Sequence, residues 1–213
     1  MILLSLMDNP VILLAWLVAV VVTLTVHEFC HALVANSLGD STARDAGRLT
    51  LNPLPHISWL GLATLLLIGF GWGNPVPFNP YNLKWPRFGP AAVALAGPAS
   101  NLIMAVISAL VFHFLAVGGI ISPDNLLTQF LQLLFVLNIS LMVFNLIPVP
   151  PLDGSKVLFA VFNDSRYSAM HEFLETRGTT ILLLLIVADN FFGLNILSGL
   201  LGFFINFFSR FLS

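Results

Sequence analysis

Two histidines and a glutamate lie within a long apolar stretch, in the run HEFCH at 27–31. Residues four apart share one face of an α-helix, so His27 and His31 can both meet one metal ion. Glu28 lies one residue beyond His27 and can reach a metal-bound water without being a ligand itself. Titratable side chains are costly inside a membrane segment, so each is a candidate for function. The pattern predicts metal-assisted hydrolysis.

Two histidines do not complete a catalytic zinc site, which usually has three protein ligands and an open position for water. The candidate third ligand is Asp153, in the segment NLIPVPPLDG at 145–154. Its prolines cannot continue a helical hydrogen-bond ladder, and Gly154 permits a sharp change of direction. We therefore expect His27, His31 and Asp153 to bind one zinc ion per chain. The alternative for Asp153 is a loop carboxylate at the membrane interface.

The composition places this site in a membrane protein. Only 8% of the 213 residues are charged and 58% are hydrophobic, whereas a soluble domain is about 25% charged. A soluble fold of this size cannot bury that much apolar surface. The net charge of −2 gives no footprint for nucleic acid. Met1–Leu6 has no basic region and no cleavage site, so no removable signal peptide is expected.

Three apolar runs are long enough to cross a bilayer as helices, which takes about 20 residues each. They cover 11–37, 91–117 and 126–147, and a further apolar stretch at 179–212 is interrupted at Asp189–Asn190. We expect an all-α, polytopic helix bundle forming one domain over 1–213. Its catalytic core covers about 11–160, and amphipathic and hydrophobic helices occupy about 161–213.

The apolar segment 59–70 is too short to cross, at about 18 Å as a helix. We expect it to enter the membrane and return to the same side, followed by a Gly- and Pro-rich stretch at 71–90. All basic residues of the three polar regions then lie on one face, which is expected to be cytoplasmic. They are Arg44, Arg48, Lys84, Arg87, Lys156, Arg166 and Arg177.

The paired motifs resemble those of the site-2 protease family, which are intramembrane zinc metalloproteases. The resemblance rests on HEFCH at 27–31 and NLIPVPPLDG at 145–154, and it covers about 11–160. The stretches GWGNPVPFNP at 71–80 and GPASN at 97–101 are also similar to the compact prokaryotic members. We expect no regulatory PDZ or CBS domain within these 213 residues.

The resemblance implies that His27, His31 and Asp153 bind zinc and that Glu28 is the general base. It also implies that Asn145 helps to hold the substrate or the developing oxyanion. Asn145 lies eight residues before Asp153, so only a bend at the prolines could bring it near the metal. The alternative for Asn145 is a hydrogen bond between helices.

Cleavage within a bilayer requires the substrate helix to unwind. Pairing with an exposed strand edge would give its backbone new partners. We expect a small β-strand or hairpin element, because Arg48–Leu51 alternates as a strand does. The candidate edges are 47–51 and 76–79.

The expected substrates are transmembrane proteins, and the expected location is a multi-pass position in a cell membrane. A prokaryotic inner membrane is implied by the resemblance. Three other interpretations stay open, namely an inactive relative acting as a membrane-helix scaffold, an ion transporter, and a non-haem iron site. Glu28 favours hydrolysis over the first and third. His56 is a further candidate for ligand or proton relay, and the oligomeric state is undetermined.

Overall fold

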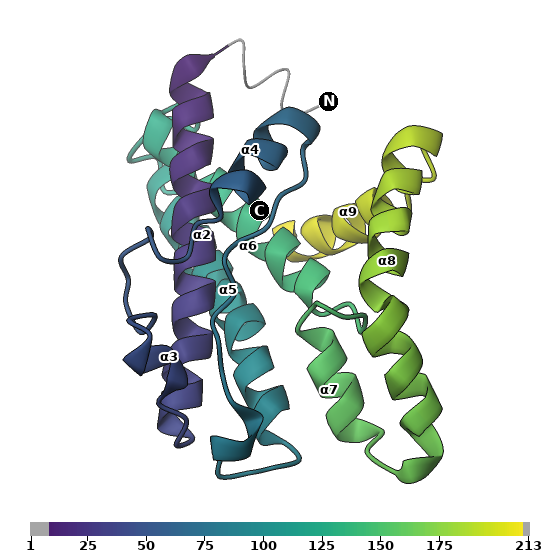
Figure 1. Ribbon diagram of the computed structural model, residues 1–213. Coiled ribbons are helices and arrows are strands. Elements are labelled where there is room, and N and C mark those ends of the chain that lie inside the picture. The colour runs from purple at the N-terminus through teal and green to yellow at the C-terminus, as the bar shows by residue number, and fades with distance from the viewer. Residues whose placement is uncertain (1–8, 211–213) are drawn as a thin grey trace.

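The computed structural model describes residues 9–210, and this part of the chain is built of helices and loops (Figure 1). Met1–Leu6 and residues 211–213 lie outside the described residues. The helices are α2 (Pro10–Ser37), α3 (Thr42–Asp45), α4 (Trp59–Ile68), η1 (Pro80–Asn82), α5 (Gly89–Phe112), η2 (His113–Val117), α6 (Leu126–Asn145), α7 (Gly154–Val161), η3 (Ser165–Tyr167), α8 (Ser168–Phe192) and α9 (Ile196–Ser209).

Within 9–210, three helices are long and apolar enough to cross a membrane, as the sequence predicts. They are α2, α5 with its continuation η2, and α6. Two of them begin at asparagine caps, because the side chain of Asn9 accepts from the backbone N–H of Val11 and that of Asn125 from Leu127. The chain is therefore a multi-pass membrane protein in its helical architecture.

The three spans pack closely in the interior and expose apolar side chains outside. Ala35 of α2 and Val93 of α5 share one buried cluster, and Ala105 of α5 packs against Phe135 and Ile139 of α6. Small side chains allow helix backbones to approach each other in lipid. The outward side chains include exposed Val11, Leu14, Ile103 and Leu110. An outer surface of apolar side chains suits contact with lipid tails.

Between α2 and α5 the chain leaves one end of the bundle and returns to the same end. The outward part leads to α4, which has only 10 residues, or about 15 Å of helix. The return part, here called the connector (residues 71–88), follows α2: Gly73 packs against Leu24, and Lys84 N–H donates to the Leu38 carbonyl at 2.9 Å. Figure 1 shows the start of α5 near the end of α2. Entry of 59–70 into the membrane stays a prediction.

The predicted β element is wrong for the described residues, because neither 47–51 nor 76–79 forms a strand. Gly47 adopts a left-handed conformation (φ 69°), and Arg48 N–H bonds back to the Ala43 carbonyl. The facing connector contains prolines at 75, 77 and 80, which cannot donate to a strand ladder. The alternating pattern therefore has no partner with which to build a sheet.

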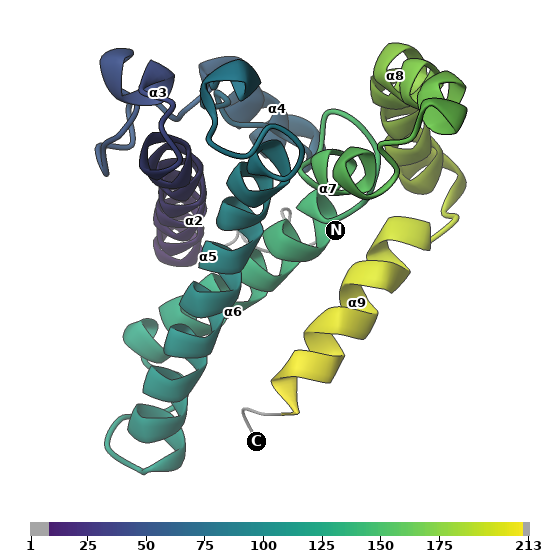
Figure 2. The same cartoon turned by 90° about the horizontal axis from the view of Figure 1, so that it is seen from below.

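The C-terminal helices flank the bundle on the side of α6. Helix α9 packs on α6 through Phe204, Ile205 and Phe208, and α8 packs on the loop after α6 through Leu182 and Ile186. Figure 2 shows α9 running beside α6, with α8 farther out. The interruption expected at Asp189–Asn190 lies slightly later, at the left-handed residues Gly193 and Asn195. Helix α8 also continues without a break through 177–179.

Candidate metal centre

The structure brings the three predicted ligands together. His27 and His31 lie on one face of α2, with their Nε2 atoms 3.0 Å apart. The Oδ2 atom of Asp153 lies 3.3 Å from Nε2 of His27 and 3.4 Å from Nε2 of His31. Residues separated by more than 120 positions in sequence thus form one compact group of three donors.

Each imidazole is oriented by a partner on α5. His31 Nδ1 lies 2.7 Å from the carbonyl oxygen of Val93, which can only accept, so His31 carries its proton on Nδ1. His27 Nδ1 lies 2.6 Å from Oδ1 of Asn101. Both Nε2 atoms are therefore unprotonated, and each faces Asp153 with a lone pair that can bind a metal. Such partners fix the tautomer and ring orientation of metal-binding histidines.

A buried chain of amides extends this support to the third span. Asn101 Nδ2 donates to Oδ1 of Asn138 on α6 at 2.8 Å. Asn138 Nδ2 donates in turn to Thr23 Oγ1 on α2 at 3.0 Å and to the Leu134 carbonyl at 2.8 Å. Asn101 and Asn138 are fully buried. The hydrogen bonds thus connect all three spans to His27.

The donor set fits a zinc ion. Two imidazole nitrogens and a carboxylate oxygen are zinc ligands, and a tetrahedral site with bonds near 2.0–2.1 Å has edges of about 3.4 Å. The distances of 3.0, 3.3 and 3.4 Å agree with such edges. Asp153 Oδ2 is buried and has no hydrogen-bond partner. Three converging lone pairs repel one another unless a cation lies between them, so the residues present fit the metal.

Two glycines make room for this arrangement. A Cβ atom on Gly97 would lie 2.5 Å from both Cε1 of His27 and Nε2 of His31. A Cβ atom on Gly154 would lie 2.3 Å from the Leu146 carbonyl oxygen. Gly154 therefore lets the chain fold back closely after the proline-containing loop, which places Asp153 at the two histidines.

Glu28 is buried at 8% exposure and is held by the connector. Its Oε2 accepts a hydrogen bond from the Val76 N–H at 2.9 Å. None of the hydrogen bonds of the described residues reaches its other oxygen, Oε1. Glu28 directly follows His27, one of the candidate ligands, on α2.

Arg48 holds the connector next to Glu28. Its guanidinium donates to the carbonyls of Pro75 at 3.2 Å and Asn74 at 2.5 Å, and to His56 Nδ1 at 3.4 Å. Burial lowers the pKa of Arg48, and the negative charge of Glu28 opposes that shift. The side chain remains a cation, as arginine does in proteins.

Asp40 forms a second attachment between the end of α2 and the connector. It is fully buried, and its carboxylate accepts from the N–H and hydroxyl of Thr42, from the Asn79 N–H at 2.7 Å and from Asn82 Nδ2 at 3.0 Å. Burial would raise the pKa of Asp40, but these hydrogen bonds outweigh it and lower the pKa. The attachment fixes the connector three residues beyond Val76.

His56 and Asn145 have other contacts than the metal group. His56 is fully buried; its Nε2–H donates to the Thr50 carbonyl at 2.9 Å and its Nδ1 accepts from Arg48. Both ring nitrogens are thus engaged away from the metal. Asn145 is half-buried and donates to the Leu141 carbonyl of its own helix at 3.1 Å. A role in substrate binding stays a prediction for Asn145.

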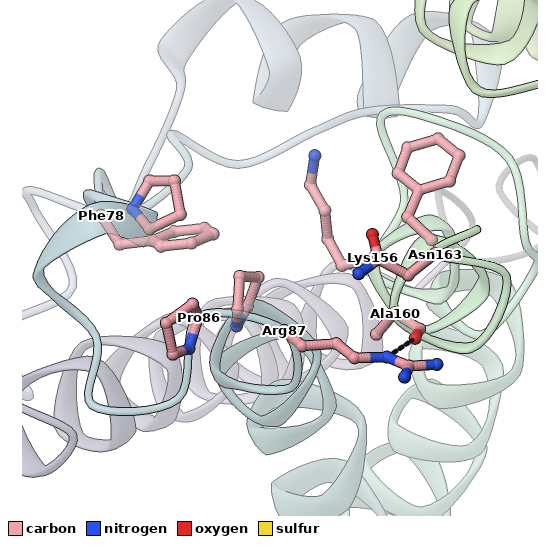
Figure 3. A pocket seen from close by; sticks show the side chains of 9 residues that line it. Phe78, Pro86, Arg87, Lys156, Ala160 and Asn163 are labelled. Atoms are coloured by element: carbon pink, nitrogen blue, oxygen red, sulfur yellow. Dashed lines mark hydrogen bonds between the residues drawn. The ribbon is translucent and has the colours of Figure 1, made fainter. Parts of the chain in front are cut away.

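A cavity of about 410 Å³ lies between the connector and α7 (Figure 3). One of the residues that line it, Lys156, lies three positions after Asp153 in the sequence. Phe78 and Pro86 line one side, and Lys156 and Asn163 line the other. Arg87 crosses beneath and donates to the carbonyls of Ala160 at 2.9 Å and Val161 at 3.2 Å. These bonds attach the end of α7 to the start of α5.

Sequence reasoning missed most of this support. Asn101 and Asn138 are amides inside apolar runs, which is a signal that could have identified them. Gly97 lies in a stretch of small residues that predicts close helix contact in lipid but not the contact with the two histidines. Arg48 and Asp40 gave no signal, because a charged residue in a polar loop is ordinarily solvated.

Comparisons with known proteins agree with this chemistry. The sequence profile of Peptidase family M50 matches residues 115–188, which include Asp153. The candidate zinc metalloprotease YwhC of Bacillus subtilis is 40% identical over 153 residues, or 70% of each chain. The candidate zinc metalloprotease Rip2 of Mycolicibacterium smegmatis is 32% identical over 165 residues, or 75% of this chain and 60% of the relative. Rip2 of Mycobacterium tuberculosis is 33% identical over 156 residues, or 69% and 55%.

No solved structure matches the chain. The identity to YwhC extends over more than two thirds of both sequences, and the zinc named for these relatives fits the donors of His27, His31 and Asp153. The site-2 protease resemblance is thereby confirmed, and the transporter and iron interpretations are set aside. The chain belongs to peptidase family M50 and is a zinc metalloprotease.

Proposed function

We propose that the chain hydrolyses peptide bonds in or near transmembrane segments of other membrane proteins. The observation that carries this proposal is the position of the metal group, whose histidines lie inside a membrane-spanning helix and whose supports come from the other two spans. A substrate must reach donors enclosed by apolar helices. Membrane-embedded segments are the substrates that meet this requirement.

In this mechanism His27, His31 and Asp153 would hold the metal, with both histidines fixed in the tautomer that leaves the Nε2 lone pair free. Zinc held there would supply a Lewis acid that activates water and polarises the scissile carbonyl. Glu28 would accept a proton on Oε1 and pass it to the leaving amine. Its Oε2 stays on the Val76 N–H, so the carboxylate does not need to reorient. Asn145 would assist by holding the substrate.

We further propose that the site opens towards the cytoplasm. Figure 1 shows α3, the start of α5 and the end of α7 at one end of the molecule, and the turn at 118–125 lies at the other. The first end carries most of the basic loop residues, whereas 118–125 has none. Loops rich in Lys and Arg stay cytoplasmic. Asp153 lies in the loop that joins α6 to α7, and α7 runs from this loop to the basic end.

Glu28→Gln is the first test of the proposed base. Glutamine can still accept the Val76 N–H but cannot take a proton, so cleavage should fall by at least about 10²-fold. Zinc content by elemental analysis of detergent-purified protein should stay at one per chain. Cleavage of a transmembrane substrate at near wild-type rate would remove Glu28 from the mechanism.

Asp153→Ala tests the distant ligand. Two histidines alone leave the site one donor short, so we expect zinc to be lost on dialysis while the wild type retains it. Asp164→Ala is the matched control, because this exposed carboxylate lies in the next loop. Equal zinc retention by the Asp153 and Asp164 variants would exclude Asp153 as a ligand.

The two stretches expected to offer a strand edge to an unwound substrate are bonded elsewhere. The N–H groups of Gly47 and Arg48 bond to the Arg44 and Ala43 carbonyls, and the Thr50 carbonyl accepts from His56. The N–H groups of Val76 and Asn79 bond to Glu28 and Asp40.

A further inference from the structure

One peptide group links Arg48 to Glu28. Arg48 Nη1–H donates to the Pro75 carbonyl, and the N–H at the other end of the same peptide, that of Val76, donates to Glu28 Oε2. The peptide bond is planar and conjugated, and hydrogen bonds in a chain polarise one another. A cation at the carbonyl end thus strengthens the donor at the amide end.

The guanidinium is fixed before it reaches this peptide. It also donates to the Asn74 carbonyl and to His56 Nδ1, and His56 is held in turn by the Thr50 carbonyl. Arg48 is only 9% exposed, and His56 is fully buried. The planar fork of arginine can hold several acceptors in one geometry, which the point charge of lysine cannot.

Burying the Arg48 guanidinium costs more free energy than the support of a loop alone would explain. Arg48 has no ion pair with a carboxylate among the described residues, and its buried Nε–H has no hydrogen-bond partner. Burying an unpaired donor costs about 1–3 kcal/mol. Native proteins satisfy most such groups, so an exception needs an explanation beyond the folding of a loop.

We infer that Arg48 is a positioning residue for Glu28, acting through the Pro75–Val76 peptide, with His56 orienting the guanidinium. The inference rests on the proposed role of Glu28 as base. A direct ion pair would occupy the carboxylate oxygens, whereas the interposed peptide fixes Oε2 and leaves Oε1 available for a proton. His56 therefore contributes to the site indirectly and not as a ligand.

The kinetic test compares Arg48→Met, Arg48→Lys and Arg44→Met in cleavage of a transmembrane substrate. Residues that support a metal site typically contribute 10–100-fold, so Arg48→Met should lower kcat by about that factor with KM and zinc content unchanged. Arg48→Lys should recover only part of the loss. Arg44→Met is the matched control, because Arg44 is exposed and pairs with Asp45 in the same loop.

A spectroscopic readout separates positioning from general damage. Pro–Val pairs occur at 10–11, 75–76 and 148–149 only, so labelling with ¹³C′-proline and ¹⁵N-valine selects three amide signals in detergent micelles. The Val76 signal, assigned with Val76→Ile, should move in both Arg48→Met and Glu28→Gln. The signals of Val11 and Val149 should stay in place.

Two results would overturn the inference: a Val76 amide that does not respond to Arg48→Met, or full recovery of kcat by Arg48→Lys. Should Arg48→Met not fold, Arg48→Lys and His56→Gln supply the same amide and kinetic readouts. Failure of the proposed function is distinguishable. It would appear as cleavage by Glu28→Gln, while the amide response to Arg48 remains measurable.

Discussion

His27 and Glu28 are neighbours on α2, yet they are held by different parts of the molecule. The imidazoles are oriented by one side chain and one carbonyl of another membrane helix, those of Asn101 and Val93 on α5. The glutamate is oriented by loop backbone, which Arg48 holds from the far side. Metal binding thus depends on helix packing, whereas the proposed proton transfer depends on a connector. The two functions should respond separately to substitution.

Gly97→Ala should have the largest effect on zinc binding, because Gly97 makes a very close contact between α5 and the two histidines. The added Cβ would lie 2.5 Å from both imidazoles, so the rings must shift and the donors no longer converge. We expect zinc to be lost and cleavage with it. Elemental analysis after dialysis measures the first effect.

Gly199→Ala is the matched control for that variant. It adds the same methyl group to a helix, at a position where the new Cβ meets nothing within 4 Å. Zinc content should equal that of the wild type. Wild-type zinc in Gly97→Ala would mean that the helix packing around the histidines is looser than the contacts indicate.

Asn101→Ala should have an intermediate effect. The variant leaves His27 Nδ1–H without its acceptor and Asn138 Oδ1 without its donor in a buried site. Zinc affinity should fall by about 10–100-fold, as measured by competition with a chelator. Asn138→Ala should weaken zinc less, since His27 keeps its acceptor, and Ser108→Ala should have no effect because Ser108 bonds only within α5. Equal zinc affinities in Asn101→Ala, Asn138→Ala and Ser108→Ala would show that the chain of amides does not contribute to metal binding.

The candidate ligands could be selected from sequence because each of the two motifs that contain them is local. The i, i+4 spacing places His27 and His31 on one face, and an aspartate after broken helix is a natural third donor. The three spans were predictable because a bilayer imposes length and apolarity on a contiguous segment. In both cases the information lies within about 25 consecutive residues.

The supports could not be predicted because their partners are remote in sequence. Nothing near Arg48 indicates that its guanidinium bonds to carbonyls at 74 and 75, and the strand pattern at 48–51 pointed to a sheet instead. The alternation arises because Leu49 packs in the cluster of Ala32, Ala43 and Val76 while Arg48 turns towards the connector. Alternation of polar and apolar residues shows that the two sides of an extended segment have different surroundings. It does not show that a second strand lies beside the segment.

Asp40→Asn should have the smallest effect on metal binding and a clear effect on stability. Asparagine offers one acceptor oxygen where the carboxylate offers two, so either the Asn79 bond or the bonds to Thr42 and Asn82 are lost. We expect a loss of about 1–3 kcal/mol, seen as a lower Tm in detergent, with zinc affinity unchanged. Asp45→Asn is the exposed control.

The pH dependence of the Tm tests whether the Asp40 carboxylate stabilises the connector through its charge. The folded pKa of Asp40 lies below its usual value, so its contribution is fully present above the unfolded pKa of about 3.9 and is lost as the pH falls through the folded pKa. The Tm difference between wild type and Asp40→Asn should therefore be largest near pH 6 and shrink towards pH 3. A difference that stays constant over that range would show that the side chain acts by shape and not by charge. A simultaneous loss of zinc affinity near pH 6 would show that the connector and the metal ligands form one support rather than two.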